Sequence, residues 1–309
     1  MDAILRWTLI PHLFCMTAIV SAVVLDDGVD GLAIVDDVQN RVMLFDRQSG
    51  DYLRDLVKSD PQRLQAPFDC DLGPVIQQGD TRHEKTVLVS DVRGEQILAY
   101  DYGAGGKFIK VFIDNIEARG IAYDRQGKLL IAAGEAGVQK YEPDGQFIET
   151  LAHDLVDGPN NAWDVLARPV GRDWWRGRQW ELLVSDVNLD AILRFDMDGT
   201  PRGVFAKRRG FRHVEQPAWR RNGNVLAADP FANAVFEFDM QGEFIRRINV
   251  RRPRGVIELG NGNLLISSQR GVQEFDGSKG TLISTKMKGN PDTAPRYIRD
   301  LSKKLPSIR

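Results

Sequence analysis

The chain has 309 residues, of which 42% are hydrophobic and 27% charged, and its 41 basic and 43 acidic residues leave a formal net charge of −2. This composition is typical of a globular protein with enough apolar residues for a sizeable core. The near balance of charge argues against a protein whose whole surface is built to hold nucleic acid, for which a basic excess is expected.

Residues 1–24 precede any recognisable repeat and contain one basic residue, Arg6, then an apolar run that ends in small residues. This order predicts a secretory signal peptide cleaved after Ala22, and therefore a secreted or periplasmic protein. Two alternatives stay open. The run approaches the length of an uncleaved membrane anchor, which would be the only membrane contact we expect, and residues 22–25 also fit a strand of the fold.

Residues 26–301 repeat a pattern of short strands separated by turns. The first copy, residues 31–57, predicts three strands joined by an Asp/Asn-containing turn and a Gly-containing turn. An aromatic residue followed by an acid closes the second strand of every copy, at intervals of 37 to 55 residues: Phe45-Asp46, Tyr100-Asp101, Tyr141-Glu142, Phe195-Asp196, Phe238-Asp239 and Phe275-Asp276. A period of about 40 to 50 residues with several strands per unit indicates a β-propeller.

A fourth strand is expected before each three-strand unit. Candidates lie at residues 66–72, 118–124, 160–166, 216–222 and 253–259. The first copy lacks one, whereas residues 295–301 (PRYIRDL) resemble 253–259 (PRGVIEL). We therefore predict an all-β, six-bladed β-propeller of four-stranded blades, closed by a C-terminal strand that joins the first blade, with residues 302–309 as a tail. Closure of the ring removes the exposed edges of an open array.

Residues 35–50 (VDDVQNRVMLFDRQSG) resemble the NHL repeat, with its Asp, short turn, Asn-Arg-hydrophobic step, Phe-Asp pair and Gly. The later copies are looser, and residues 26–301 as a whole are similar to an NHL-like six-bladed propeller, broadly related to the senescence-marker/gluconolactonase-like propellers. The resemblance implies a fold shared by binding scaffolds, RNA-binding domains, lactonases and amidating lyases. Fold similarity does not select among these functions.

In such propellers the ligand mouth is usually formed by the starts of the inner strands and the loops between second and third strands. Alignment of the predicted inner strands places one column of residues there: Arg119, Asn161, Pro217, Arg254 and Arg296, with Ala66 or Pro67. Three guanidinium groups around one channel would clamp a carboxylate or phosphate. The alternative is that each arginine pairs with a loop aspartate and links the blades; the loop aspartates are Asp36, Asp37, Asp91, Asp186, Asp190 and Asp229.

Residues 157–165 (DGPNNAWDV) resemble the Pro-Asn segment of the metal-dependent lactonases, which makes Asn160, or Asn161, a candidate metal ligand. The three arginines of the mouth, however, stand where a hard cation would need oxygen ligands. The amidating lyases use several histidines around zinc, whereas this chain has only four histidines and no His-x-His spacing. We therefore expect neither a metal nor another cofactor.

His213, directly before an inner strand, is the best acid/base candidate, with Glu215 beside it. A single histidine of this kind is more often an ordinary surface residue. In the enzyme alternative the site is centred on His213, Asn161 and the three arginines of the mouth.

A second candidate surface is the insertion at residues 169–180, which contains Trp174, Trp175 and Arg176. Tryptophan and arginine together are enriched in binding hot spots, so this segment predicts contact with a partner. The alternative is that its tryptophans cover the underside of the ring.

These features favour a non-catalytic, exported propeller that recognises a protein partner or a small anionic ligand at its channel mouth. The alternative class is an enzyme, a hydrolase or lyase of lactonase-like architecture. An RNA-binding NHL module comes third, because the predicted leader and the balanced charge both argue against nucleic acid.

Overall fold

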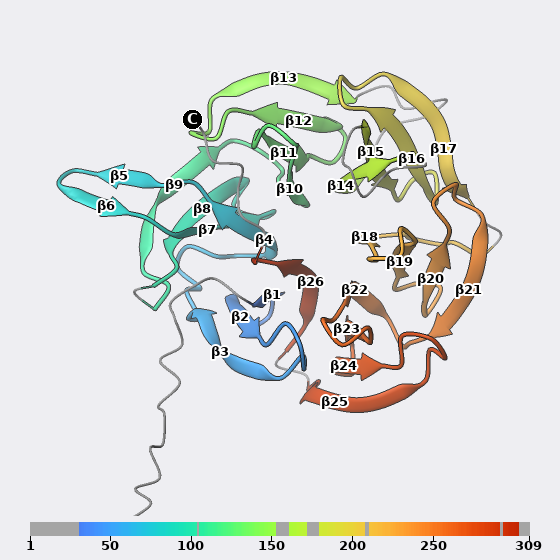
Figure 1. Cartoon of the computed structure of the whole chain (residues 1–309). Coiled ribbons are helices and arrows are strands. Elements are labelled where there is room, and N and C mark those ends of the chain that lie inside the picture. Colours follow the sequence, from blue (N-terminus) through green and yellow to red (C-terminus); the bar gives the residue numbers. More distant parts are fainter. Residues whose placement is uncertain are drawn as a thin grey trace, which may run out of the picture.

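The computed structural model describes residues 31–103, 105–152, 161–171, 179–207, 210–290 and 293–302. These residues form six four-stranded antiparallel sheets and one two-stranded hairpin, and the sheets are arranged as a ring around a central channel (Figure 1). The prediction of an all-β, six-bladed propeller is confirmed. The predicted leader at residues 1–24 lies outside the described residues, among which no helix is long and apolar enough to cross a membrane.

The first blade joins the two ends of the described chain. From the channel outward its strands are β26 (Pro295–Asp300), β1 (Leu32–Asp36), β2 (Arg41–Phe45) and β3 (Tyr52–Val57). Strand β1 pairs antiparallel with β26, with Ile34 opposite Ile298, and Figure 1 shows β26 (dark red) beside β1 (blue). The predicted closure of the ring by the C-terminal strand is therefore confirmed.

The other five blades follow in chain order, each from its inner to its outer strand. The second has β4 (Pro67–Gly73), β7 (Thr86–Asp91), β8 (Gln96–Asp101) and β9 (Phe108–Asp114), and the third β10 (Ile121–Tyr123), β11 (Leu129–Ala132), β12 (Val138–Tyr141) and β13 (Phe147–Ala152). The fourth has β14 (Ala162–Val170), β15 (Gln179–Asp186), β16 (Ala191–Asp196) and β17 (Pro201–Lys207). The fifth has β18 (Pro217–Trp219), β19 (Val225–Asp229), β20 (Ala234–Phe238) and β21 (Phe244–Asn249), and the sixth β22 (Pro253–Glu258), β23 (Leu264–Ser268), β24 (Gly271–Phe275) and β25 (Leu282–Lys288).

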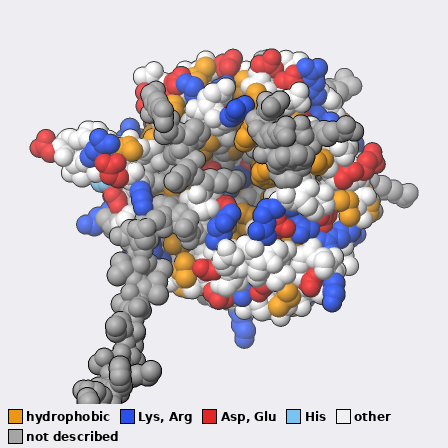
Figure 2. All heavy atoms as spheres, in the orientation of Figure 1, with side chains coloured by type: hydrophobic (Ala, Val, Ile, Leu, Met, Phe, Trp, Pro, Cys, Tyr) orange, Lys and Arg blue, Asp and Glu red, His pale blue; other side chains and the backbone are white. Residues whose placement is uncertain are grey.

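A hairpin of β5 (Ile76–Gln78) and β6 (Thr81–His83) projects from the second blade, between β4 and β7 (Figure 1). Two contacts hold it against the blade: the Gln78 side chain, next to the turn, donates a hydrogen bond to the carbonyl of Ile109, and His83, at the base, contacts Asp101. In the face shown in Figure 2, acidic and basic side chains are interspersed, and the hairpin carries both signs of charge.

The apolar core lies between neighbouring blades. Val35 and Val42 of the first blade, for example, belong to one cluster with Val87 and Val89 of the second, and five comparable clusters complete the ring. Strands in the second position of a blade are covered on both faces, which explains why β1, β7, β19 and β23 are buried along their whole length. The outermost strands have one open edge and are correspondingly more polar.

In several blades an aspartate ends the second of the four strands, as at Asp186 of β15 and Asp229 of β19, and shapes the turn that follows. Asp186 accepts hydrogen bonds from the backbone N–H groups of Asn188 and Leu189 at 2.9 and 3.0 Å. Asp229 does the same for Phe231 and Ala232. These buried carboxylates satisfy backbone donors in the turns, as aspartate typically does, so they are occupied by the fold itself.

A buried ion cluster crosses the channel below the mouth. Arg299 of β26 donates hydrogen bonds to Asp69 of β4, with its Nε 2.9 Å from both carboxylate oxygens, and to Asp164 of β14. Asp69 also accepts the backbone N–H of Ile121, which begins the inner strand of the third blade. One guanidinium and two carboxylates thus connect the first, second, third and fourth blades.

Gln216 completes this layer on the other side of the ring. Its side chain accepts the backbone N–H of Val256 and donates to the carbonyl of Ile298, which links the fifth, sixth and first blades. Glycine is required at two positions of the layer: a Cβ at Gly120 would lie 2.1 Å from an oxygen of Asp164, and one at Gly255 would lie 2.7 Å from the Gln216 oxygen. The missing side chains make room for the polar groups that fill the channel.

Prediction: Arg299→Met will lower the free energy of unfolding by about 3 to 5 kcal/mol, because it leaves the buried Asp69 carboxylate without its counter-charge and Asp164 without its hydrogen-bond donor. Removal of both charges in Arg299→Met/Asp69→Asn/Asp164→Asn should restore part of this loss. As a control, Arg202→Met breaks an exposed pair with Asp196 and should change stability little, because solvent screens such pairs. Equal effects of the two single variants in urea denaturation would show that the channel cluster does not hold the ring.

Candidate functional site: the channel mouth

Each inner strand contributes one side chain to the same level of the channel mouth. In blade order these residues are Arg296, Phe68, Arg119, Trp163, Glu215 and Arg254, and all six line one cavity of about 370 Å³. In four blades the position is fixed by strand pairing. The residue just before the mouth residue lies opposite the last residue of the second strand: Pro295 opposite Asp36, before Arg296, and Pro67 opposite Asp91, before Phe68. Trp163 and Arg254 are placed in the same way. Arg119 and Glu215 reach the same level through equivalent backbone hydrogen bonds to Ala132 and Ala228.

The alignment from sequence differs from the structure in the fourth and fifth blades, whereas in the second blade its candidate Ala66 lines the cavity together with Phe68. It places Asn161 and Pro217 at this level, where the structure has Trp163 and Glu215, and it misses Phe68. Pro217 instead lines a cavity at the other end of the channel. Bulges in the inner strands do not account for this, because β22 and β26 also contain them and are aligned correctly. In the fourth blade the physical reason is that the apolar Trp163 resembles a core residue although it faces the channel, so the alignment there is two residues out.

The three arginines of the mouth have different surroundings. Arg296 is almost fully buried and makes an ion pair with Asp37, with its Nε 2.6 Å from the carboxylate. Arg119 is also largely buried and contacts Glu117 and Asn161. Arg296 and Asp37 both belong to the first blade, where the pair ties the C-terminal strand to the loop after β1. The hydrogen bond from Arg119 to the neighbouring blade goes to Asn161, so neither pair is the predicted link between an arginine and an aspartate of adjacent blades.

Arg254 is the arginine that is held least. Its side chain is 32% exposed, and its one ion pair with a described residue is a long contact, 3.4 Å from Nη1 to an oxygen of Glu215. This contact exceeds the usual distance for an N–H···O hydrogen bond. Arg254 is thus the guanidinium best placed to bind a ligand.

Aromatic rings form the rest of the wall. Phe68 packs edge-on against Trp163, with ring centroids 5.4 Å apart, and the guanidinium of Arg296 lies 4.5 Å from the centre of Phe68. Arg119 lies 4.6 Å from the centre of Trp163. Phe231, which is 53% exposed, completes the rim. Cationic groups stacked on aromatic rings fit a planar ligand that carries negative charge.

Glu215 is the buried carboxyl of the cavity. It is 1% exposed, and its Oε2 has no hydrogen-bond partner among the described residues. Burial raises the pKa of Glu215 to about 7, against the opposing influence of Arg254 and Arg296. At neutral pH this carboxyl is therefore close to its midpoint and exchanges a proton readily.

His213 lies between Trp163 and Phe231, with ring centroids 4.4 and 4.9 Å away. Its Nε2 is 3.6 Å from an oxygen of Glu215. Burial lowers the pKa of His213 to about 4, and the charges of Arg254 and Arg119 act in the same direction. The imidazole is consequently neutral at physiological pH, and the cavity retains its positive charge only on arginine.

The structure thus brings together five predicted residues, Arg119, Arg254, Arg296, His213 and Glu215, in one cavity. Asn161 lies just outside it and accepts a hydrogen bond from the indole N–H of Trp163 at 3.1 Å. The partner-binding candidates Trp174, Trp175 and Arg176 and the metal candidate Asn160 lie outside the described residues. No group of three or more His, Cys, Asp or Glu side chains in the described ranges is arranged to hold a metal ion.

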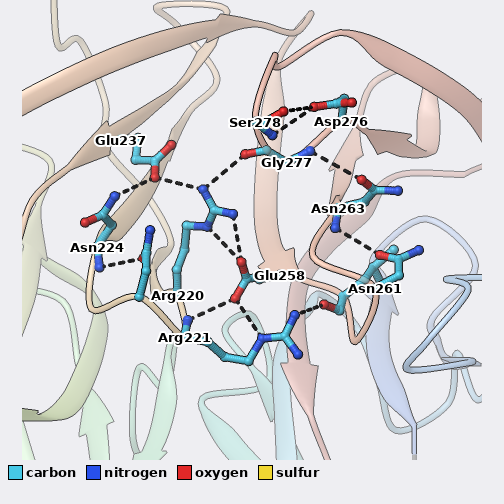
Figure 3. A network of polar contacts seen from close by, with 12 residues as sticks. Arg220, Arg221, Asn224, Glu237, Glu258, Asn261, Asn263, Asp276, Gly277 and Ser278 are labelled. Carbon is cyan, nitrogen blue, oxygen red and sulfur yellow. Dashed lines mark hydrogen bonds and ion pairs between the residues drawn. The ribbon is translucent and has the colours of Figure 1, made fainter. Parts of the chain in front are cut away.

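A larger cavity of about 460 Å³ opens at the opposite end of the channel, but its arginines are all paired. Arg220 lies between Glu237 and Glu258 at 2.9 and 2.7 Å, and Arg221 also contacts Glu258 (Figure 3). Arg47 is paired with Asp300. The contacts of Arg220 and Arg221 join the fifth and sixth blades, and the Arg47–Asp300 pair lies within the first blade. The arginines there belong to the fold, which leaves the mouth as the candidate site.

No family model and no curated protein sequence matches the chain. Among solved structures it is similar to a chain of the nidogen–laminin complex (TM-score 0.59, 16% identity, covering 87% of this chain and 97% of that one). It is also similar to virginiamycin B lyase from Staphylococcus aureus (TM-score 0.57, 12% identity, 88% of both chains). A gluconolactonase from Xanthomonas campestris matches with a TM-score of 0.51 and 19% identity over 75% of this chain and 89% of that one. These likenesses show a shared propeller fold, consistent with the resemblance found in the sequence.

Prediction: the stability difference between Glu215→Gln and the native chain will depend on pH. Folding raises the pKa of the Glu215 carboxyl from 4.5 to about 7. The folded state of the native chain therefore loses stability as the pH rises through that window. The glutamine variant should therefore gain up to about 3 kcal/mol over the native chain between pH 4.5 and pH 8. Thermal or urea unfolding across this range measures the gain. The exposed Glu95→Gln on the same face is the control, and a flat difference for Glu215→Gln would contradict the assignment.

Proposed function

We propose that this propeller binds a small anionic ligand with an apolar or aromatic part at its channel mouth. The supporting observation is the composition of one cavity: three guanidinium groups and the rings of Phe68, Trp163 and Phe231 surround it, and its carboxyl, Glu215, is buried. Arginine offers a carboxylate or phosphate two parallel N–H donors, while the rings accept the apolar part. Export, predicted from residues 1–24, would place this site outside the cytoplasm.

Arg254 provides the main anion contact in this proposal. Protonation of Glu215 below pH 7 removes the one negative charge that faces Arg254. Anion binding should therefore strengthen as pH falls toward 5. The neutral state of His213 over most of this range keeps the histidine from masking the effect.

A protein partner fits the same site if it presents a carboxylate next to an aromatic or aliphatic side chain. A propeller of similar shape occurs in the nidogen–laminin complex, a complex between proteins. The likeness supports a general capacity of the fold for such contacts, while the chemistry of the mouth defines what the partner must offer.

Prediction: Arg254→Gln will weaken binding of phenylacetate about tenfold, the loss of one charge-assisted contact, and will change the melting temperature little. Arg296→Gln will mainly lower the melting temperature, because it leaves Asp37 without its buried counter-charge. Titration calorimetry at pH 6 and thermal melting separate the two effects. Native-like phenylacetate affinity in Arg254→Gln, or no binding by the native chain, would refute the proposal.

A second candidate function is acid–base catalysis, with the enzyme class a lyase or hydrolase. It is favoured by one observation, the buried Glu215 whose Oε2 is unpartnered and whose pKa of about 7 suits a general base at neutral pH. Arg254 would stabilise negative charge that develops on a carbonyl or carboxylate of the substrate. Neutral His213 lies beside Glu215 and is positioned to orient the substrate or relay a proton.

Prediction: if Glu215 is a general base, the native protein will accelerate exchange of the C3 protons of phenylpyruvate for deuterium in D₂O. Glu215→Gln should reduce this exchange at least about 100-fold, the usual contribution of a positioned base, while phenylacetate binding persists. Proton NMR follows the exchange. If the native protein binds phenylacetate but the exchange rate of phenylpyruvate equals that in buffer, the general-base hypothesis is refuted and the protein is a binding module.

A further inference from the structure

A second cavity of about 330 Å³ adjoins the mouth. It is lined by Pro230, Phe231, Asn233, Arg251, Arg252 and Gln269, which belong to loops of the fifth and sixth blades. Phe231 lines both cavities. The exposed ring of Phe231 therefore forms a shared wall, with His213 4.9 Å from it and the guanidinium of Arg252 5.7 Å from it.

Arg251 and Arg252 differ from most arginines of this protein. Both are exposed, and neither forms an ion pair or a side-chain hydrogen bond with a described residue. At the opposite end of the channel, by contrast, Arg220 and Arg221 are fully engaged with carboxylates and carbonyl groups (Figure 3). The unpaired guanidinium groups are available to a ligand.

The backbone at Arg252 supports a specific role for this residue. Its φ angle is +47°, in the left-handed region, which asparagine or glycine adopts more readily than arginine. The Asn233 side chain holds this conformation by accepting the backbone N–H of Arg252 at 3.0 Å. A long basic side chain at a position suited to asparagine is a local strain of the kind found at binding sites.

The exposed charges around this cavity are basic. Lys207, Arg212 and Arg270 are exposed on this face of the fourth, fifth and sixth blades, whereas Asp186, Glu215 and Asp229 are buried and Asp190 of the fourth blade is half-buried near Lys207. Asp229 is also occupied by backbone N–H groups. An anion that enters this region therefore meets guanidinium groups without exposed competing carboxylates.

We propose that the mouth continues over Phe231 into a second anion-binding subsite formed by Arg251 and Arg252, so that the ligand is an elongated dianion. This inference rests on the proposed function and specifies its ligand class. One carboxylate or phosphate binds Arg254, an apolar or aromatic middle lies over Phe231, and a second anionic group binds Arg251 and Arg252.

The test compares phenylacetate, which has one carboxylate, with 1,3- and 1,4-phenylenediacetate, which have two, by titration calorimetry at fixed ionic strength. In the native chain we expect at least one of the dianions to bind about five- to tenfold more tightly than the monoanion, as expected for one or two additional partly exposed ion pairs. In Arg251→Gln/Arg252→Asn this ratio should fall to about one, with phenylacetate binding retained. Asparagine is suited to the left-handed backbone at position 252, so this variant should fold normally.

Arg93→Gln/Arg125→Gln is the matched control, because it removes two exposed, unpaired arginines of the second and third blades and should leave the ratio unchanged. Phenylacetate binding without a gain for either dianion, or a gain that survives Arg251→Gln/Arg252→Asn, would overturn the second subsite alone. An equal loss of the ratio in the control would assign the effect to overall charge and overturn it as well. Failure of all three compounds to bind the native chain would refute both the proposed function and this inference.

Discussion

The ion cluster of Arg299, Asp69 and Asp164 is the interaction on which the closed ring depends. A propeller has no single core, because its apolar contacts are divided among the interfaces between neighbouring blades. The channel is where most blades meet, and here it is filled by charged and polar groups. Burial raises the pKa of Asp164 to about 8, which shows how strongly this environment resists a second negative charge. Asp164 is therefore mostly protonated at neutral pH, and one arginine from the C-terminal strand balances the remaining negative charge on Asp69.

The same cluster separates the two ends of the channel. Above it, the inner strands present arginine, phenylalanine, tryptophan and glutamate to an open cavity. Below it, Arg220 and Arg221 bind Glu258 and neighbouring carbonyl groups and thereby tie the fifth and sixth blades together. Arginine thus has two roles in one molecule, and its partners rather than its presence distinguish them. A guanidinium bonded to several carboxylate or carbonyl oxygens belongs to the fold, whereas Arg254, with one long contact to Glu215, is free to bind.

The chemistry of the mouth follows from what burial does to Glu215 and His213. Both groups are driven toward their neutral forms, so the carboxyl gains a pKa of about 7 and the imidazole stays uncharged. Positive charge on the arginines is then the dominant field in the cavity below pH 7. A site of this kind changes its preference for anions over the pH range in which one buried carboxyl titrates.

The fold and its closure could be predicted from the sequence, because both depend on local, repeated signals. These signals are alternating apolar residues, an aromatic-acid pair at the end of the third strand of each blade, and the likeness of residues 295–301 to 253–259. The sequence also indicated Arg119, Arg254, Arg296, His213 and Glu215 as candidates. It could not show that Phe68, Trp163 and Glu215 share a level with the arginines, because an apolar residue that faces the channel, such as Trp163, has the sequence pattern of a core residue. Tertiary structure alone decided which arginine is free, because pairing depends on residues distant in the chain, such as Asp37 beside Arg296. The sheet pattern is a local property of the sequence, whereas the charge and burial of a side chain are set by whichever strands the ring brings next to it.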